Sequence, residues 1–218
     1  MATPNTDEKV DYSCVFSEQH WRAADWLLVK RPDWDHYGDW RQYADFIENV
    51  TPMADDPAAL EWKPEEGFDW GGKLITQTHA GMVYGRPVNG DFVVASSMAF
   101  TYRMAPSIVF GTLVPSARPT HQEYLESWEI VLWDEGINVW QQTIANHAVQ
   151  WTLIGYAKHP FHRHTRYTLE VRRTKQTLDI RIDALRFGLL DPTLPAQCYV
   201  GITGCEGVNR FYDFRVEQ

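Results

Sequence analysis

The segment that decides the fold is RYTLEVRRTKQTLDIRI, residues 166–182. Its apolar side chains recur at every second position on both sides of a polar turn, with charged residues between them. The apolar set is Tyr167, Leu169, Val171, Leu178, Ile180 and Ile182. A period of two is typical of a strand with one face in a core. The segment therefore predicts two antiparallel strands joined by a hairpin.

Further strands are predicted on both sides of this hairpin. After Pro192 and Pro195 the pattern resumes as QCYVGITGCEGVNRFYDFRVEQ, residues 197–218, with Gly204, Gly207 and Asn209 supplying turn residues. The predicted strands cover 73–84, 91–104, 107–114, 127–133, 137–144, 150–157, 166–173, 177–183, 198–203 and 210–216. Short strands separated by turn signals predict an all-β chain folded as a two-sheet antiparallel β-sandwich.

The N-terminal third lacks this pattern. Residues 17–70 are rich in Trp and Asp and are interrupted by prolines, which predicts an irregular segment packed on the sandwich. One or two short helices are expected there, with residues 56–60 as a candidate, because Asp56 can cap the helix and Pro57 is tolerated in its first turn. We expect residues 1–218 to form one domain, with residues 1–16 flexible.

Charge and cysteine content indicate which binding partners and which cellular compartment to expect. Twenty basic and 29 acidic residues give a net charge of −9, which argues against nucleic acid and anionic membranes as partners. The sequence shows neither a secretory leader pattern nor an apolar run of about 18 residues. Three cysteines form a sparse, odd set that is typical of reduced thiols. These features predict a cytoplasmic protein.

The closing segment YVGITGCEGVNRFYDFRV, residues 199–216, resembles the final strands of the concanavalin A-like lectin and glucanase jelly roll. From Trp26 onward the chain is similar to a bacterial family of that fold associated with sugar-utilisation genes. This resemblance implies an oligosaccharide ligand and is compatible with a homodimer. It also allows a structural calcium near the last strand, with Asp213 as a ligand, and implies no other cofactor. The superfamily contains hydrolases, lyases and lectins, so fold alone does not choose an activity.

The strongest local candidate for chemistry is SWEIVLWDEGINVW, residues 127–140. Alternation predicts that Trp128, Ile130 and Leu132 face the core, and that Glu129, Val131 and Trp133 share the opposite face. An indole can stack on a sugar ring, and a carboxylate can transfer a proton. The alternative is that Glu129 is a solvated strand residue and Trp133 a packing residue.

A glycoside hydrolase needs a second carboxylate, about 5 to 9.5 Å from the first. Laminarinase-type hydrolases of this fold carry three acids in the order Glu-x-Asp-x-x-Glu, whereas this strand has Glu129 alone, followed by Asp134 and Glu135 where it is expected to end. Glu123 and Glu206 are the candidates for the second carboxylate.

A lyase is a further hypothesis. Gln77-Thr78-His79 resembles the Gln-x-His strand of alginate-lyase jelly rolls. In that comparison the amide would neutralise a uronate carboxylate and His79 would handle protons, with Tyr102 and Arg103 completing the set.

Histidine and tryptophan clusters each allow two interpretations. His159, His162 and His164 would either hold a transition metal or form a polar loop before the strand at Arg166. Six of the ten tryptophans lie in the first 70 residues, and they would either anchor the irregular segment or line a groove. Further candidates for ligand contact are Trp40, His121, Asn138, Trp140, Glu206 and Arg210.

These observations rank three functions. The first is an intracellular enzyme that cleaves a glycosidic bond of an oligosaccharide, with Glu129 as acid or base. The second is a non-catalytic, lectin-like protein or subunit, and the third is the lyase. Gly-x-Ser-x-Gly, phosphate-loop, dinucleotide-binding and His-Glu-x-x-His signatures are absent from the sequence, so we expect no nucleotide chemistry and no catalytic metal.

Overall fold

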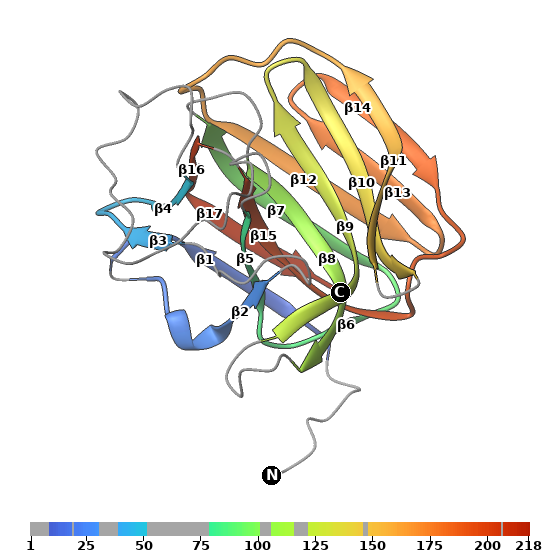
Figure 1. Cartoon of the computed structure of the whole chain (residues 1–218). Helices are drawn as coiled ribbons and strands as arrows, with labels where there is room; N and C mark the ends of the chain where they lie inside the picture. Colours follow the sequence, from blue (N-terminus) through green and yellow to red (C-terminus); the bar gives the residue numbers. More distant parts are fainter. Residues whose placement is uncertain are drawn as a thin grey trace.

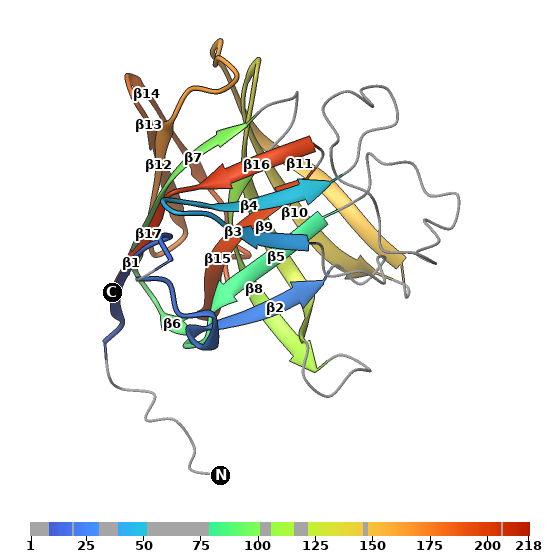
Figure 2. The same cartoon turned by 90° about the vertical axis from the view of Figure 1, so that its left-hand side faces the viewer.

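The computed structural model describes residues 9–18, 20–30, 39–51, 79–100, 106–115, 122–145, 148–205 and 207–218. They form two β-sheets with a hydrophobic core between them (Figures 1 and 2), which confirms the predicted all-β sandwich. These residues contain no α-helix; they include a 3-10 turn at Ala23–Asp25. The helix expected at residues 56–60 lies outside the described residues.

The first sheet has nine strands in the order β14-β13-β12-β7-β16-β4-β3, with β17 beside β7 and β1 beside β17. Its strands are β1 (Asp11–Val15), β3 (Asp39–Gln42), β4 (Ile47–Thr51), β7 (Phe92–Phe100), β12 (Tyr167–Thr174), β13 (Thr177–Ile182), β14 (Leu185–Leu190), β16 (Gly207–Phe211) and β17 (Asp213–Glu217). Every pair in this sheet is antiparallel.

The second sheet has eight strands in the order β11-β10-β9-β2-β5-β15-β6, with β8 between β15 and β9. Its strands are β2 (Trp26–Lys30), β5 (His79–Tyr84), β6 (Val88–Asn89), β8 (Pro106–Pro115), β9 (Gln122–Trp133), β10 (Gly136–Ala145), β11 (Ala148–Lys158) and β15 (Gln197–Cys205). The pairs β15-β8, β8-β9, β9-β2, β2-β5 and β5-β15 close a five-stranded, barrel-like unit. The sequence pattern did not predict this closure.

The closed unit brings β5 very close to β15. Gly201 lies between Val83 on β5 and Val109 on β8. A Cβ atom at Gly201 would lie 2.0 Å from the backbone oxygen of Met82, which is far inside van der Waals contact. This position therefore requires glycine.

The predicted hairpin at 166–182 is confirmed as β12 and β13, and all six of its apolar residues are buried. The opposite side of the core is centred on Trp128, which is fully buried and stacks on Phe110 with 5.6 Å between ring centroids. The Trp128 indole N–H donates a hydrogen bond of 2.7 Å to Asp191 Oδ2. A buried indole is thus both packed and hydrogen-bonded.

The structure corrects the expectation that residues 17–70 are irregular, since this segment contains β2, β3 and β4. These strands are short, and β4 buries Glu48 and Asn49 instead of alternating apolar residues, so a search for a period of two misses it. The strand β14 was also missed, and residues 210–216 belong to two strands separated at Tyr212. The segment before residue 17, which was expected to be flexible, contains β1 paired with β17.

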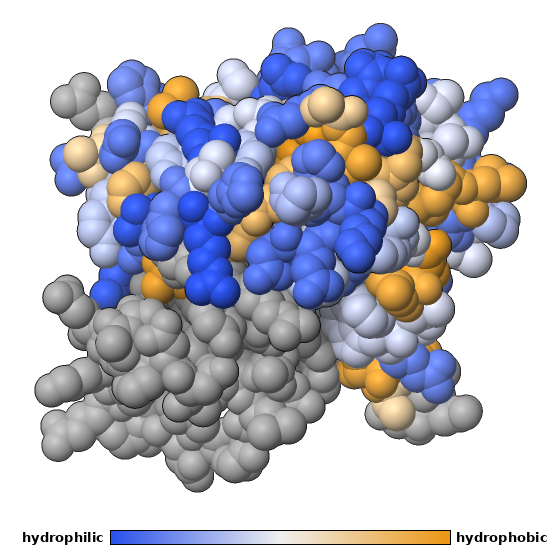
Figure 3. All heavy atoms as spheres, turned by 90° about the horizontal axis from the view of Figure 1, so that it is seen from above, coloured by the Kyte–Doolittle hydropathy of each residue, from blue (hydrophilic) through white to orange (hydrophobic). Residues whose placement is uncertain are grey.

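On the face drawn in Figure 3, the coloured part of the surface is mainly hydrophilic, with hydrophobic side chains in separate patches. Among the residues that the structure describes, the most exposed large hydrophobic side chain is that of Leu190 on β14, at 73%. Among the described residues, no helix has the length and apolar character needed to cross a membrane.

Candidate functional site on the outer face of β9, β10 and β11

The two faces of β9 divide as the alternation predicts. Trp128, Ile130 and Leu132 are fully buried in the core. Because successive side chains of a strand point to opposite faces, Glu129, Val131 and Trp133 lie on the face turned away from that core. The prediction that an acid and an indole share this face is therefore confirmed.

Pairing with β10 extends this face sideways. Trp140 lies opposite Glu129, and Asn138 lies opposite Val131. On the next strand Tyr156 lies opposite Asn138, and Trp151 lies opposite Gln142. We call the surface formed by Trp133, Trp140, Trp151 and Tyr156 the aromatic face.

The rings of the aromatic face are partly open to solvent. Tyr156 is 46% exposed, and its ring centroid lies 6.4 Å from that of Trp133 with an interplanar angle of 50°. Leu153, opposite Trp140, is 47% exposed and adds apolar area between the rings. Partly exposed aromatic side chains beside the Asn138 amide offer apolar faces and hydrogen-bonding groups together. Such a surface suits a ligand with both C–H faces and hydroxyl groups.

Glu129 lies at the inner margin of this surface, where β9 joins the closed unit. It is flanked by Trp140 on β10 and by Val109 on β8, and it is only 3% exposed. A carboxylate at this depth is shielded from bulk water, so its interactions with neighbouring polar groups are strengthened.

Tyr124, on the same strand, is the buried neighbour that sequence reasoning missed. Its hydroxyl has no hydrogen-bond partner among the described residues. Burial, and secondarily the charge of Glu129, raises the pKa of Tyr124 well above its ordinary value. The hydroxyl therefore stays protonated and can serve as a hydrogen-bond donor, and it is a poor nucleophile.

The closed unit makes room for this hydroxyl at Gly81. A Cβ atom at Gly81 would lie 3.6 Å from Tyr124 Oη and 3.3 Å from Thr203 Oγ1. The Thr203 hydroxyl donates to the Ala80 carbonyl oxygen at 2.9 Å, and Ser107 Oγ donates to the Thr203 carbonyl oxygen at 3.2 Å. Both hydroxyls thus donate to backbone carbonyl oxygens, and the Tyr124 hydroxyl does not take part in these bonds.

The structure does not place Glu123 beside Glu129. The two are six residues apart on β9, about 20 Å at the usual strand rise, and Glu123 forms an ion pair of 3.1 Å with Lys30. Asp134, just past the end of β9, lies 3.9 Å from the Arg163 guanidinium. Within the described residues of β8, β9 and β10, the positions that share the face of Glu129 carry no other carboxylate.

The other predicted residues lie elsewhere. Arg210 is on the nine-stranded sheet, where its Nε lies 2.9 Å from Glu48 Oε2. Trp40 packs against the core, 5.7 Å from the Phe211 ring, which favours its role as an anchor. His79 is the first residue of β5, and its backbone lies opposite that of Cys205. Gln77, Tyr102, Arg103, His121 and Glu206 lie outside the described residues.

The metal-binding interpretation of the histidine cluster is not supported. The described part of the chain contains no group of three or more His, Cys, Asp or Glu side chains that could hold a metal ion. His159 packs edge-on against Phe161, with 4.8 Å between ring centroids, while His162 and His164 are exposed in the loop before β12. This agrees with the polar-loop alternative. A structural calcium near the last strand stays a prediction.

Solved structures with the same arrangement of strands identify the fold. LamAcat from Zobellia galactanivorans aligns with a TM-score of 0.58 at 10% identity, over 98% of this chain and 98% of that chain. The carbohydrate-binding module CBM66 from Bacillus subtilis aligns with a TM-score of 0.57 at 11% identity, over 88% and 99%. The β-glucanase of Bacillus licheniformis aligns with a TM-score of 0.56 at 7% identity, over 95% and 98%. The fold is the concanavalin A-like jelly roll.

Sequence comparison adds nothing to this assignment, because no family model and no curated protein matches the chain. The similarity of this jelly roll to one bacterial family of the fold therefore stays a prediction. Identities near 10% show a shared fold and leave the activity to be argued from the site.

Two members of the aromatic face, Trp151 and Tyr156, were absent from the sequence-based candidates. The signal that would have found them is the hairpin of β10 and β11, because both strands were predicted and their pairing places these rings beside Asn138 and Gln142. A register shift between Val139 and Trp140 hides this relationship from simple counting.

Proposed function

We propose that this jelly roll is a carbohydrate-binding protein whose aromatic face holds an oligosaccharide. The observation that carries the proposal is the gathering of Trp133, Trp140, Trp151 and Tyr156 on one sheet face, with Asn138 between them. Stacking of sugar rings on indole and phenol rings supplies apolar contact, and the amide supplies directed hydrogen bonds. Solved structures of the same fold include a carbohydrate-binding module and a β-glucanase, which supports this ligand class.

Cleavage of a glycosidic bond is the second candidate function, and the environment of Glu129 favours it. The Glu129 carboxyl group lies opposite Trp140 at the margin of the aromatic face and is only 3% exposed, so it is placed to exchange a proton with a ligand held on that face. Hydrolysis by the usual two-carboxylate mechanism would require a second acid, about 5 to 9.5 Å away. The described positions of β8, β9 and β10 on this face do not supply one, so binding is the better supported function.

One experiment separates the two functions. A panel of oligosaccharides is tested with the wild-type protein and with Glu129→Gln, and both the dissociation constant and the release of reducing ends are measured. Binding without release by the wild type supports a lectin-like protein. Release that is lost in Glu129→Gln while affinity is kept supports a hydrolase. If no oligosaccharide binds or is cleaved, the proposal is wrong.

A further inference from the structure

A separate pocket lies on the other side of the sandwich, on the outer face of the nine-stranded sheet. It crosses β12, β7, β17 and β1, where Ser97 pairs with Thr168 and where Arg215 lies between Ala95 and Ser13. Its volume is about 570 Å³, within the range of about 300–1,000 Å³ typical of small-molecule sites. Small side chains on neighbouring strands leave this space open.

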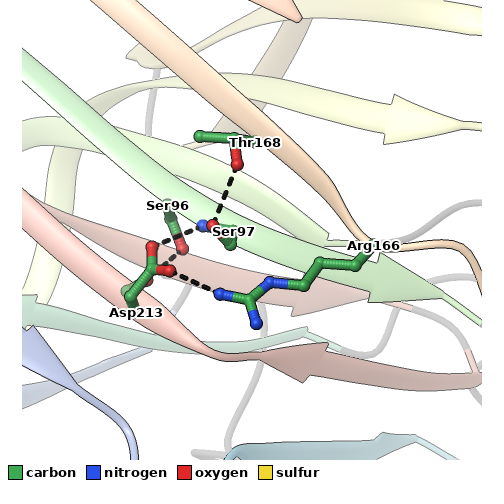
Figure 4. Close-up of polar contacts among 5 residues, drawn as sticks. All are labelled: Ser96, Ser97, Arg166, Thr168 and Asp213. Carbon is green, nitrogen blue, oxygen red and sulfur yellow. Dashed lines mark hydrogen bonds and ion pairs between the residues drawn. The ribbon is translucent and has the colours of Figure 1, made fainter. Parts of the chain in front are cut away.

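The charged groups of the pocket are already compensated. The Asp213 carboxylate accepts a hydrogen bond of 2.8 Å from the Ser97 backbone N–H, and its other oxygen lies 2.8 Å from Arg166 Nη2 (Figure 4). Arg215 Nη2 lies 2.7 Å from Glu170 Oε2. An anionic ligand would therefore meet a paired guanidinium next to a carboxylate, and a cationic ligand would meet a carboxylate whose charge is balanced. The pocket favours a neutral ligand.

The remaining hydrogen-bonding groups both donate and accept. Ser97 Oγ and Thr168 Oγ1 lie 2.9 Å apart and share one hydrogen bond (Figure 4). Each hydroxyl has one proton and two lone pairs, so this bond leaves one proton and three lone pairs for a ligand. His20, whose Nδ1 lies 2.7 Å from Ser17 Oγ, has its second ring nitrogen left for a similar role. A mixture of donors and acceptors without net charge matches hydroxyl groups of a ligand.

The pocket also has an exposed apolar side chain. Val15 on β1 is 53% exposed and lines it, whereas the side chain of Phe214, 1% exposed, belongs to the core beneath. Val15 can contact a C–H face of a polyhydroxylated ring while the serine and threonine hydroxyls bond its oxygens.

We propose that this pocket is a second ligand site, distinct from the aromatic face, and that it binds a neutral polyhydroxylated ring of monosaccharide size. The hydroxyl pair of Ser97 and Thr168 recognises hydroxyl groups of the ring, and Val15 contacts its C–H surface. Because the site lies across the sandwich from the aromatic face, the proposal stands or fails independently of the function proposed above.

The test is a titration of the ¹⁵N-labelled protein followed by nuclear magnetic resonance, with D-glucose, D-galactose, D-fructose and myo-inositol as probes. The Ser97 amide is a direct reporter, because its N–H donates to Asp213 Oδ1. We expect saturable shifts of the Ser97, Thr168 and Arg215 amides with at least one probe, with a dissociation constant on the order of 1 mM. Thr168→Val keeps the shape of the side chain but removes the hydroxyl, and it should weaken binding about 3- to 10-fold.

Two further variants make the result specific. Ser13→Trp places a large side chain on the exposed strand β1 at the pocket and should abolish the shifts. Thr177→Val, the same change at an exposed position of β13, should leave them unchanged. The proposal is overturned if no probe gives saturable shifts at these amides up to about 100 mM, or if binding persists unchanged in both Thr168→Val and Ser13→Trp. Preferential binding of acetate or phosphate in the same pocket would also overturn it.

Discussion

Glu129 and Trp140 face each other across the β9-β10 pair, so that a nearly buried carboxyl group and an indole project from the same sheet face. Directly paired side chains of an antiparallel sheet have Cβ atoms about 4.5–5.5 Å apart. A ligand resting on Trp140 is thereby brought next to Glu129. This relationship connects the binding surface with the residue best placed for chemistry.

Removing the Trp140 ring should weaken oligosaccharide binding. We expect Trp140→Ala to raise the dissociation constant about 10- to 150-fold, because covering one aromatic ring contributes on the order of 1.5–3 kcal/mol. Isothermal titration calorimetry measures the change. Tyr43→Ala is the matched control, since Tyr43 is an exposed aromatic residue stacked on Phe46, away from the aromatic face. Equal losses in both variants would contradict the assignment of the site.

Tyr124→Phe should separate stability from function. The Tyr124 hydroxyl is buried without a partner among the described residues, so its removal should leave the free energy of unfolding unchanged or raise it by up to about 1 kcal/mol. If the hydroxyl donates a hydrogen bond to a ligand, Tyr124→Phe should also lower the affinity for that ligand or its turnover. Urea unfolding and calorimetry together decide this, and a loss of stability above about 1 kcal/mol would show that the hydroxyl has a structural partner.

Asp191 should be important for stability through its contact with Trp128. Its carboxylate accepts hydrogen bonds from the buried Trp128 indole N–H and from the Thr193 backbone N–H. Asp191→Ala leaves both donors without this acceptor, and we expect it to lower the free energy of unfolding by about 2–4 kcal/mol. Asp191→Asn retains one acceptor oxygen and should cost less. Urea unfolding measures both variants, and equal effects of the two would argue against the hydrogen bonds as the cause.

The cysteine thiols should be unreactive in the folded protein. Burial raises the pKa of the Cys14 thiol to about 12, and burial also raises the pKa of Cys198 to about 12 despite the opposing effect of Arg173. At pH 8 the fraction of either residue present as thiolate is on the order of 10⁻⁴. Ellman's reagent should therefore react slowly with the native protein. After denaturation it should react readily with all three cysteines. Rapid reaction of Cys14 in the native state would contradict this prediction.

The same shifts set the sign of a pH dependence. Both folded-state pKa values are raised above the ordinary thiol value of 9.0, so the unfolded chain loses these protons first. Their contribution to stability is complete below pH 9 and is lost as the pH rises from 9 toward 12. Urea midpoints measured between pH 8 and 11 should fall, and Cys198→Ala should reduce the slope.

Much of the sandwich could be predicted because each long strand has one face in the core. The alternation of Tyr167 to Ile182 predicts β12 and β13, and the alternation around Trp128 places Glu129 on the face opposite to the sandwich core. Burial on one side of a sheet forces a period of two into the sequence, and that signal is local. The short strands β2, β3 and β4 carry too few residues for such a signal and owe their conformation to neighbouring strands.

The sequence by itself determined the all-β class, the two-sheet layering and the face on which Glu129 and Trp133 lie, because these follow from side-chain alternation. Only the tertiary structure decided which strands are neighbours, and therefore which side chains meet. Closure of β15, β8, β9, β2 and β5 places Glu129 and Tyr124 in a buried setting and leaves Glu123 with Lys30. The pairing of β9, β10 and β11 gathers Trp140, Trp151 and Tyr156 on one surface. Strand order depends on contacts between residues far apart in the chain, which no local period records.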